Sequence, residues 1–158
     1  GYWRDVGTID AYFQAHQDLL GAEPKFDMFN PKWRIGSSNY QGPSPKFFRA
    51  EVDNSIVSSG GLIKGARLRN SIVRSEVLLE EDVELDECIV MDYAVLRKGV
   101  RLKRVIVDRY NTIEAGDHIG YDEDSDRRRF SVTDSGIVVV PRGQCTDTRA
   151  DGVMFRYL

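Results

Sequence analysis

The protein has 158 residues, of which 41% are hydrophobic and 30% are charged, a composition typical of a globular domain. Its 22 basic and 25 acidic side chains give a formal net charge of −3, which argues against general binding of nucleic acid. Two cysteines, Cys88 and Cys145, are too few for a disulfide framework, and no apolar run approaches the roughly 20 residues of a membrane span. We therefore expect a cytoplasmic protein with neither nucleic acid nor membrane among its partners. Because the sequence starts at Gly1 rather than at methionine, we also expect a segment of a longer polypeptide.

The chain opens with a helical pattern in residues 1–20. Apolar side chains recur there at the spacing of one helix face, Thr8 is a suitable N-cap, and Gly21 is a suitable end. Residues 21–50 contain four prolines, which exclude a long helix, together with six aromatic side chains. We expect an extended connector whose aromatic side chains pack on a surface of the protein.

The next part of the chain repeats with a period of about 17 residues. Apolar residues form three columns at this spacing, and turn-like residues form a fourth. The columns are Ile56, Ile72, Ile89 and Ile106; Leu62, Leu79, Leu96 and Ile113; Leu68, Leu85, Leu102 and Ile119; and Gly65, Asp82, Gly99 and Gly116. The period is too short for a helix-pair repeat, and β-branched doublets broken by glycine and charge are typical of short strands and tight corners. We predict a parallel β-helix of at least four stacked coils.

Charged residues repeat at the same spacing and alternate in sign. In stacked parallel strands such side chains are neighbours about 4.8 Å apart, so we expect ion pairs between successive coils. The three charged columns are Lys64, Glu81 and Lys98; Arg67, Glu84 and Arg101; and Arg69, Asp86 and Lys103. Exposed pairs of this kind set the register of the coils more than they stabilise the fold.

After the last coil, a charged stretch from Tyr121 to Arg129 precedes one further strand within Ser131 to Val140, which Pro141 ends. A final strand or cap at this position protects the open edge of the last coil. The tail from Gly143 onward has no periodicity.

A conventional active site is hard to find. The sequence contains no Gly-x-Ser-x-Gly, phosphate loop or Cys-x-x-Cys. His118 falls in the outward column after Arg101, which leaves open an acyltransferase of the hexapeptide-repeat type, although no partner acid or long projecting loop accompanies it. Cys88 shares a column with Ser55 and Ser71, which predicts a small packed side chain.

Several segments resemble bacterial glucose-1-phosphate adenylyltransferase (ADP-glucose pyrophosphorylase), in the order of that family and over residues 2–142. Residues 2–12 resemble the end of the catalytic domain, and Ser58-Ser59-Gly60-Gly61 resembles the turn of the first coil. Further matches are Pro45-Lys46-Phe47, Val105-Ile106-Val107-Asp108-Arg109, Ile113-Glu114-Ala115-Gly116, Arg128-Arg129-Phe130 and Gly136-Ile137-Val138-Val139-Val140.

The resemblance implies a division of the chain into four parts. Residues 1–20 are the last helix of a nucleotidyltransferase catalytic domain, 21–50 a connector, 51–142 a left-handed parallel β-helix for regulation and oligomerisation, and 143–158 a tail. Enzymes of the family make ADP-glucose and pyrophosphate from ATP and glucose 1-phosphate in glycogen biosynthesis. Their nucleotide-binding loop lies upstream, so we expect no complete catalytic site and no activity from this chain alone. The implied partners are its own catalytic domain and further copies of itself, tetramers in the family.

One candidate metal ligand follows from the same resemblance. Asp5 matches a family aspartate that binds the catalytic Mg²⁺, an ion that takes one or two carboxylates plus substrate phosphates. The companion carboxylate lies outside this chain, so we expect Asp5 to bind Mg²⁺ only together with the missing domain. Judged from the pattern alone, Asp5 is a helix-entry carboxylate.

The resemblance also implies a site for small anionic metabolite effectors. Arg109 and Arg142 match basic positions associated with activator binding at the junction between the β-helix and the catalytic domain. A guanidinium group suits this role because its planar fork binds phosphate oxygens bidentately. The alternative for Arg109 is an ordinary ladder pair with Asp92, one coil earlier, whereas Arg142 has no obvious ladder partner.

Four further residues are weaker effector candidates. Ser58, Ser59 and Gly60 form a turn whose hydroxyl and backbone N–H groups suit an anion, and Lys46 is either a further contact or a solvated lysine. The sequence departs from the family where Gly60-Gly61 is followed by Leu62 rather than by cysteine, and in the tail. The β-helix region of another sugar-nucleotide pyrophosphorylase and a stand-alone β-helix scaffold stay open as alternatives.

Overall fold

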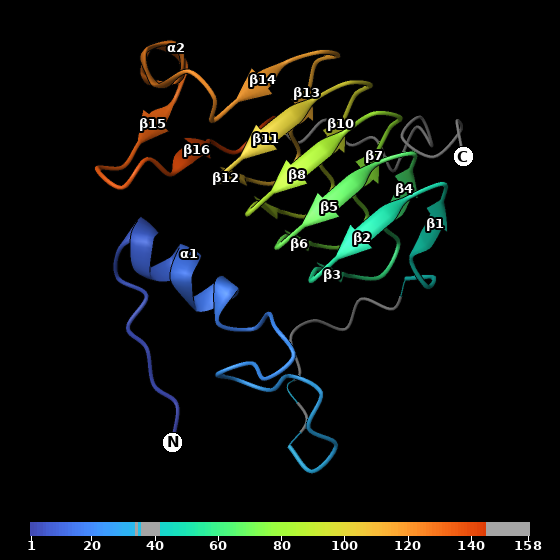
Figure 1. Ribbon diagram of the computed structural model, residues 1–158, viewed down its shortest axis with the longest axis vertical. Coiled ribbons are helices and arrows are strands. Elements are labelled where there is room, and N and C mark those ends of the chain that lie inside the picture. The colour runs from blue at the N-terminus through green and yellow to red at the C-terminus, as the bar shows by residue number, and fades with distance from the viewer. Residues whose placement is uncertain (34, 36–41, 145–158) are drawn as a thin grey trace.

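Short runs of β-branched residues and leucine, separated by tight corners, fold into strands of two or three residues that wind into a three-sided solenoid (Figure 1). This is seen in a computed structural model, which describes residues 1–33, 35 and 42–144. Each side of the solenoid is one sheet, and each coil contributes one strand to each sheet. All strand pairs are parallel except β15 with β16. The predicted parallel β-helix is therefore confirmed.

The three sheets contain successive strands of the chain. Sheet A contains β1 (Lys46–Phe48), β4 (Leu62–Lys64), β7 (Leu78–Leu79), β10 (Val95–Leu96) and β13 (Thr112–Ile113). Sheet B contains β2 (Glu51–Asp53), β5 (Arg67–Arg69), β8 (Glu84–Asp86), β11 (Arg101–Lys103) and β14 (His118–Ile119). Sheet C contains β3 (Ile56–Val57), β6 (Ile72–Val73), β9 (Ile89–Val90), β12 (Val105–Val107), β16 (Val138–Val140) and β15 (Ser131–Val132).

The first coil begins earlier than the sequence indicates. Lys46 starts β1, which pairs with β4, so the last residues of the expected connector already belong to the solenoid rather than preceding a β-helix that starts at 51.

The core consists of inward side chains stacked coil on coil. The predicted column of Leu68, Leu85, Leu102 and Ile119 is confirmed in sheet B, with all four side chains buried. The isoleucine column is in register in sheet C but on its outer face, where Ile89 and Ile106 pack beneath helix α1. The valines next to these isoleucines, Val73, Val90 and Val107, are the side chains that face the core. The turn column is also confirmed, because its four residues all have left-handed φ values between 57° and 74°.

The column that begins with Leu62 is wrong by one residue. In sheet A, Leu62 pairs with Leu78, and Ile63 is the residue that stacks on Leu79. The physical reason is a one-residue insertion at the corner between sheets A and B. Paired residues of adjacent strands are 16 positions apart in the sequence between β1 and β4 and between β4 and β7. From the pair of β5 with β8 onward they are 17 positions apart.

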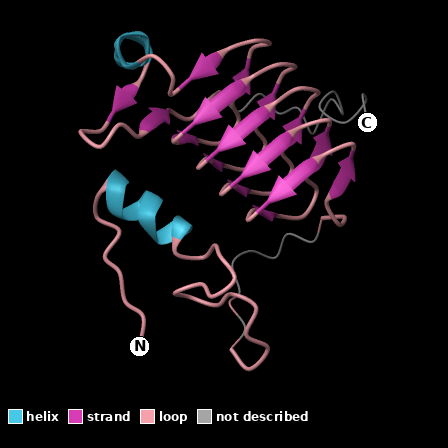
Figure 2. Cartoon of the chain, in the orientation of Figure 1, coloured by secondary structure: helices cyan, strands magenta, loops and turns pink. Residues whose placement is uncertain are grey.

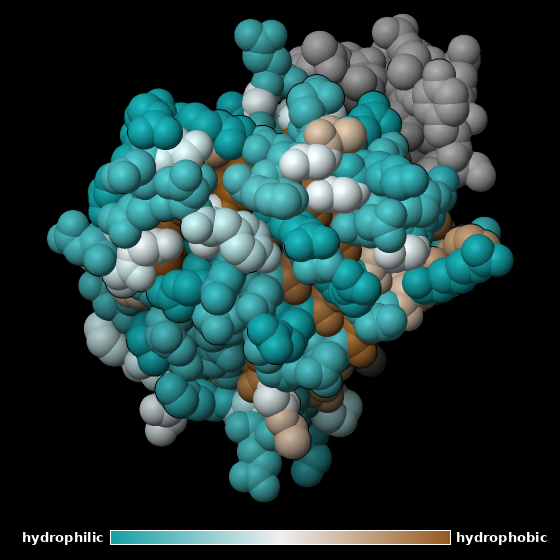
Figure 3. All heavy atoms as spheres, turned by 45° about the horizontal axis from the view of Figure 1, so that its top comes forward, coloured by the Kyte–Doolittle hydropathy of each residue, from teal (hydrophilic) through white to brown (hydrophobic). Residues whose placement is uncertain are grey.

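The charged columns of sheet B form the expected ladders. Glu84 accepts a hydrogen bond from Arg67 and makes an ion pair with Arg101, whose Nη2 lies 3.7 Å from Glu84 Oε1. Arg69 Nη2 lies 2.6 Å from Asp86 Oδ2. At the edge of sheet A the ion pair is instead Arg97 with Glu80, at 2.7 Å, one position away from the predicted Glu81–Lys98 pair. Hydrophilic residues cover most of the visible face, with hydrophobic ones showing in narrow strips between them (Figure 3).

Helix α1 (Ile9–Gln17) lies against the outer face of sheet C. The Thr8 hydroxyl accepts a hydrogen bond from Ala11 N–H at 3.1 Å, as the predicted N-cap requires. Phe13 is buried and packs on Ile89, Ile106 and Ile137, which anchors the helix to the solenoid.

The connector after α1 differs from expectation. Its described residues contain neither helix nor strand before β1 (Figure 2). Phe29 and Trp33 are 78% and 69% exposed, so the prediction that these aromatic side chains pack on the protein is wrong for them.

The charged stretch after β14 is a short helix, α2 (Glu123–Arg129), which the sequence analysis did not identify. The Asp122 side chain caps it by accepting from Ser125 N–H, and its first turn is acidic and its last turn basic. The predicted final strand is β16, and β15 pairs beside it in the opposite direction. Phe130 and Val132 pack against the core, so this insertion is the expected cap. Of the tail, residues 145–158 lie outside the described residues.

Neither helix of the described residues has the length and apolar character needed to cross a membrane.

Candidate functional site

The corner that joins sheet C to sheet A stacks the main candidate residues in one line. At this corner, a backbone N–H of each coil donates to a carbonyl oxygen of the coil before it. The bonds run from Tyr93 to Ser75 O, from Tyr110 to Asp92 O and from Gly143 to Arg109 O. These bonds align two columns, which we call the corner ladder. Its members are Ser59, Ser75, Asp92, Arg109 and Arg142, and next to them Gly60, Glu76, Tyr93, Tyr110 and Gly143. Arg109 and Arg142 are thus neighbours, one coil apart.

Three charged side chains meet at the centre of the corner ladder. The Nε atoms of Arg74 and Arg109 each lie 3.2 Å from Asp92 Oδ2. The other oxygen, Oδ1, accepts from Ser75 N–H at 3.3 Å. The ladder pair proposed as the alternative for Arg109 therefore exists.

Aromatic rings continue the ladder beside these charges. The rings of Tyr93 and Tyr110 are stacked, with centroids 5.3 Å apart and planes inclined by 3°. The Arg142 guanidinium lies over the Tyr110 ring, 5.1 Å from its centroid. This cation–π contact holds Arg142 at the end of the stack and leaves its hydrogen-bond donors for another acceptor.

Helix α1 borders the same corner. Burial raises the pKa of Tyr12, whose hydroxyl lies within electrostatic reach of Arg74, Asp108, Arg109 and Asp92. A surface hollow of about 230 Å³ lies between the helix and the solenoid, lined by Tyr12 and Asp108 among mainly apolar residues. The corner therefore lies beside the junction between α1 and the solenoid.

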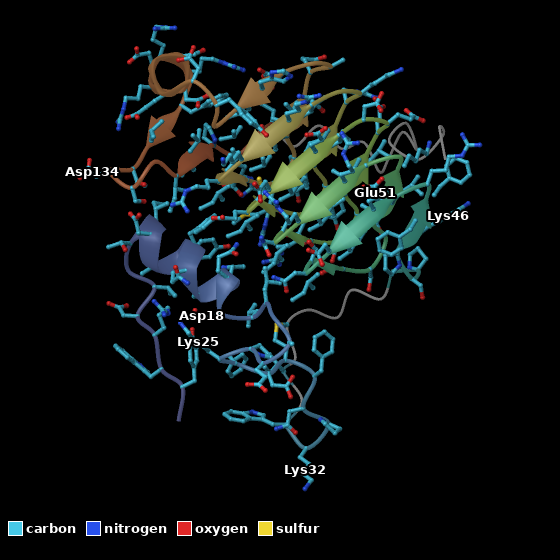
Figure 4. The ribbon with its side chains drawn as sticks, viewed as in Figure 1. Asp18, Lys25, Lys32, Lys46, Glu51 and Asp134 are labelled. Carbon is cyan, nitrogen blue, oxygen red and sulfur yellow. The ribbon has the colours of Figure 1, made fainter. Side chains whose placement is uncertain are left out.

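The remaining effector candidates lie at the opposite end of the solenoid. Ser59 stands three coils from Arg109, about 14 Å at the usual strand spacing. The sequence analysis offered the N–H groups of this turn to an anion. Instead, Ser58 N–H donates to Val73 O at 2.9 Å and Gly60 N–H donates to Pro43 O at 2.7 Å. Lys46 and Gly60 line a separate hollow of about 320 Å³ (Lys46 is labelled in Figure 4).

Asp5 lies in the exposed segment before α1. Its Oδ1 accepts from Gly7 N–H at 3.2 Å, the bond of a helix-entry turn. Within residues 1–33, 35 and 42–144, no group of three or more metal-binding side chains comes together. Asp5 thus has the helix-entry contact that its pattern alone indicates, and its role as a Mg²⁺ ligand stays a prediction.

Two other residues singled out from the sequence have structural surroundings. His118 pairs in register with Arg101 on the outer face of sheet B, and the neighbouring Asp117 bonds to Arg129, which gives no support to acyl transfer. Burial raises the pKa of the Cys88 thiol to about 12, so it is a packed, unreactive side chain as predicted.

Sequence reasoning missed a buried carboxylate at the end of α1. Asp18 accepts from Tyr2, Gln14 and Lys25 at 2.9 to 3.2 Å, and Arg4 Nη2 lies 2.7 Å away (Figure 4). Burial raises the pKa of Asp18, but hydrogen bonds from Lys25, Gln14 and Tyr2 and the Arg4 charge outweigh it and lower the pKa to about 2. This cluster ties the first residues of the chain to α1. The four polar partners of Asp18 do not follow any regular spacing, so no sequence pattern predicts this cluster.

Comparison with known proteins agrees with this architecture. Residues 43–140 match the family described as "GlmU-like, C-terminal hexapeptide". The chain is 44% identical over 142 residues to a glucose-1-phosphate adenylyltransferase of Thermodesulfovibrio yellowstonii, and 38% identical over 148 residues to that of Deinococcus deserti. These alignments cover 90% and 89% of this chain but only 34% and 36% of the relatives, so the chain spans about a third of their length.

The matched segment coincides with the solenoid, since it begins shortly before β1 and ends with β16. The columns of stacked side chains are the repeat that such a family profile describes. The chain therefore belongs to the GlmU-like C-terminal hexapeptide family.

Proposed function

We propose that this chain is the regulatory and oligomerisation region of a glucose-1-phosphate adenylyltransferase. The parent enzyme makes ADP-glucose and pyrophosphate from ATP and glucose 1-phosphate, and the catalytic core, with its Mg²⁺, belongs to the remainder of the polypeptide. The single observation that carries the regulatory role is the placement of Arg109 and Arg142 side by side on the corner ladder. The Arg109 charge acts on Tyr12 of helix α1, so an anion bound at Arg109 would lie close to the place where α1 meets the solenoid.

The chemistry of the corner suits a small phosphorylated metabolite. Two guanidinium groups one coil apart offer parallel donors to phosphate oxygens. The hydroxyl of Tyr12 and the carboxylate of Asp108 border the adjoining hollow and offer partners to sugar hydroxyls.

The exposed apolar side chains support contact with other parts of an assembly. Trp3, Phe29 and Trp33 on the N-terminal third of the chain are exposed, as are Phe47 and Val52 on the first coil. Exposed apolar side chains are candidates for interaction sites where they gather on one face. We assign the first three to the catalytic domain and the first coil to a contact between copies.

Calorimetric titration with glucose 1,6-bisphosphate tests the regulatory role. We expect salt-sensitive binding to the chain that Arg109→Ala and Arg142→Ala each weaken about tenfold. Arg97→Ala is the matched control, because Arg97 also forms an ion pair between coils but lies at the edge of sheet A. Salt-independent binding, or equal loss in the control, would refute the effector site and favour a scaffold. The chain alone should form no ADP-glucose, and measurable synthesis would contradict the assignment of the catalytic core to the missing part.

A further inference from the structure

The Asp92 carboxylate, at the centre of the corner ladder, lies against the guanidinium group to which we assign the anion. Asp92 Oδ2 lies 3.2 Å from Nε of Arg109 and 3.2 Å from Nε of Arg74. Its side chain is only 13% exposed and is fixed by the Ser75 N–H, whereas the Arg109 side chain is 46% exposed. A fixed acceptor thus holds a cation whose outer edge faces solvent.

The charge balance of the corner depends strongly on this residue. Arg74, Arg109 and Arg142 contribute three positive charges, and Glu76, Asp92 and Asp108 contribute three negative charges, so the corner has no net charge. Removing the Asp92 charge would leave one positive charge. Because Asp92 lies against Arg109, an anion approaching the outer edge of this guanidinium meets the repulsion of a nearby carboxylate.

We propose that Asp92 is a built-in competitor of the anion that binds Arg109 and Arg142, and so sets the affinity of the site. This inference rests on the proposed effector site. In the free protein Asp92 shares its charge between Arg74 and Arg109. A bound anion takes the Arg109 donors, and Asp92 is then left with Arg74 as its remaining ion-pair partner.

Two effects of Asp92 oppose each other, and their sizes decide the sign. As an orienting partner, Asp92 helps ligand binding, but ion pairs between partly exposed side chains hold side chains only weakly. As a competing charge it hinders binding, and this repulsion grows with the charge of the ligand. Competition therefore outweighs orientation, the more so for a bisphosphate than for a single phosphate.

Titration of the 158-residue chain with inorganic phosphate and with glucose 1,6-bisphosphate tests this inference. We expect Asp92→Asn to bind the bisphosphate about tenfold more tightly than the unmodified chain does, and phosphate about threefold more tightly. In Asp92→Asn with Arg109→Ala the gain should disappear. Glu80→Gln is the matched control, since Glu80 pairs with Arg97 in the same way on sheet A, and it should leave both affinities unchanged.

The outcomes separate this inference from the proposed function. If Arg109→Ala weakens binding but Asp92→Asn leaves it unchanged or weakens it, Asp92 is an ordinary ladder residue and only this inference fails. If Arg109→Ala has no effect, the effector site itself is wrong. Circular dichroism and thermal unfolding of each variant show whether the solenoid is intact, and Asp92→Glu gives a charge-conserving variant whose affinity should stay near that of the unmodified chain.

Discussion

The solenoid and the segment before it are stabilised in opposite ways. From β1 to β16, inward side chains stack on the equivalent side chains of neighbouring coils, and most of the buried residues form one continuous core. The segment of residues 1–33 has one buried apolar anchor, Phe13, and one polar cluster, around Asp18. A stack of coils distributes its stability over many equivalent contacts, whereas the N-terminal segment depends on two particular residues.

The largest effect should come from a charge in the shared core. Leu85→Asp places a carboxylate among the stacked leucines of sheet B, where no partner offsets its desolvation. We expect this variant to lose the cooperative unfolding transition in urea followed by circular dichroism. Leu85→Met keeps the volume and should cost less than about 1.5 kcal/mol. A folded Leu85→Asp chain would mean that the coils do not depend on one another.

Removal of the apolar anchor should release α1 and leave the coils intact. Phe13→Ala removes the side chain that packs on Ile89 and Ile106, a change that costs about 3–5 kcal/mol in protein cores. Hydrogen exchange should show faster exchange in residues 9–17 and unchanged protection in β8 and β11. Ile9→Ala, on the same helix but 41% exposed, should change little. Loss of protection throughout the solenoid would show that α1 and the coils form one cooperative unit.

The polar cluster should respond to pH. The pKa of Asp18 is about 2 in the folded protein and 3.8 ordinarily, so its contribution is fully present above pH 3.8 and is lost as the pH falls through about 2. Asp18→Asn should loosen the N-terminal segment at neutral pH by about 1–3 kcal/mol, because Lys25 and Arg4 lose their charged acceptor.

Hydrogen exchange of residues 9–17 at pH 5, 3 and 2 measures this dependence. Protection should fall with pH in the unmodified chain and vary much less in Asp18→Asn. Equal pH dependence in both chains would assign the effect to another carboxylate.

The smallest effect should come from a ladder ion pair. A double-mutant cycle of Arg97→Ala and Glu80→Ala should give a coupling energy below about 1 kcal/mol, because both side chains are partly exposed. The coupling should shrink further in 1 M salt. A larger, salt-resistant value would show that the ladders contribute to stability as well as to register.

The sequence predicts the solenoid well because each column of similar residues repeats the same strand register over several coils. The sheet B leucines, the sheet C isoleucines and the left-handed corner residues are each correct over four coils. The error at Leu62 arises because Leu62 and Ile63 are both apolar, so the hydrophobic pattern accepts either register. Only the shorter corner at Gly65 distinguishes them.

The candidate site was harder to predict for a physical reason. Arg109 with its partner Asp92, and Tyr93 with Tyr110, follow from the 17-residue count. The contact of Arg142 with Tyr110 instead requires the last coil to resume at β16, after an insertion that breaks the count. Helix α2 could have been found from Asp122, with its acidic first turn and basic last turn, because these are the signals of a short capped helix.

The insertion of α2 and β15 makes the two ends of the solenoid different. One end of the solenoid is closed by these elements and by Phe130 and Val132, while at the other end β1, β2 and β3 are the outermost strands of their sheets. A stack with two open ends can add copies without limit, as in a fibre, because every addition leaves a new open edge. Among the described residues, the cap formed by α2 and β15 therefore stops edge-to-edge addition at the end that it covers.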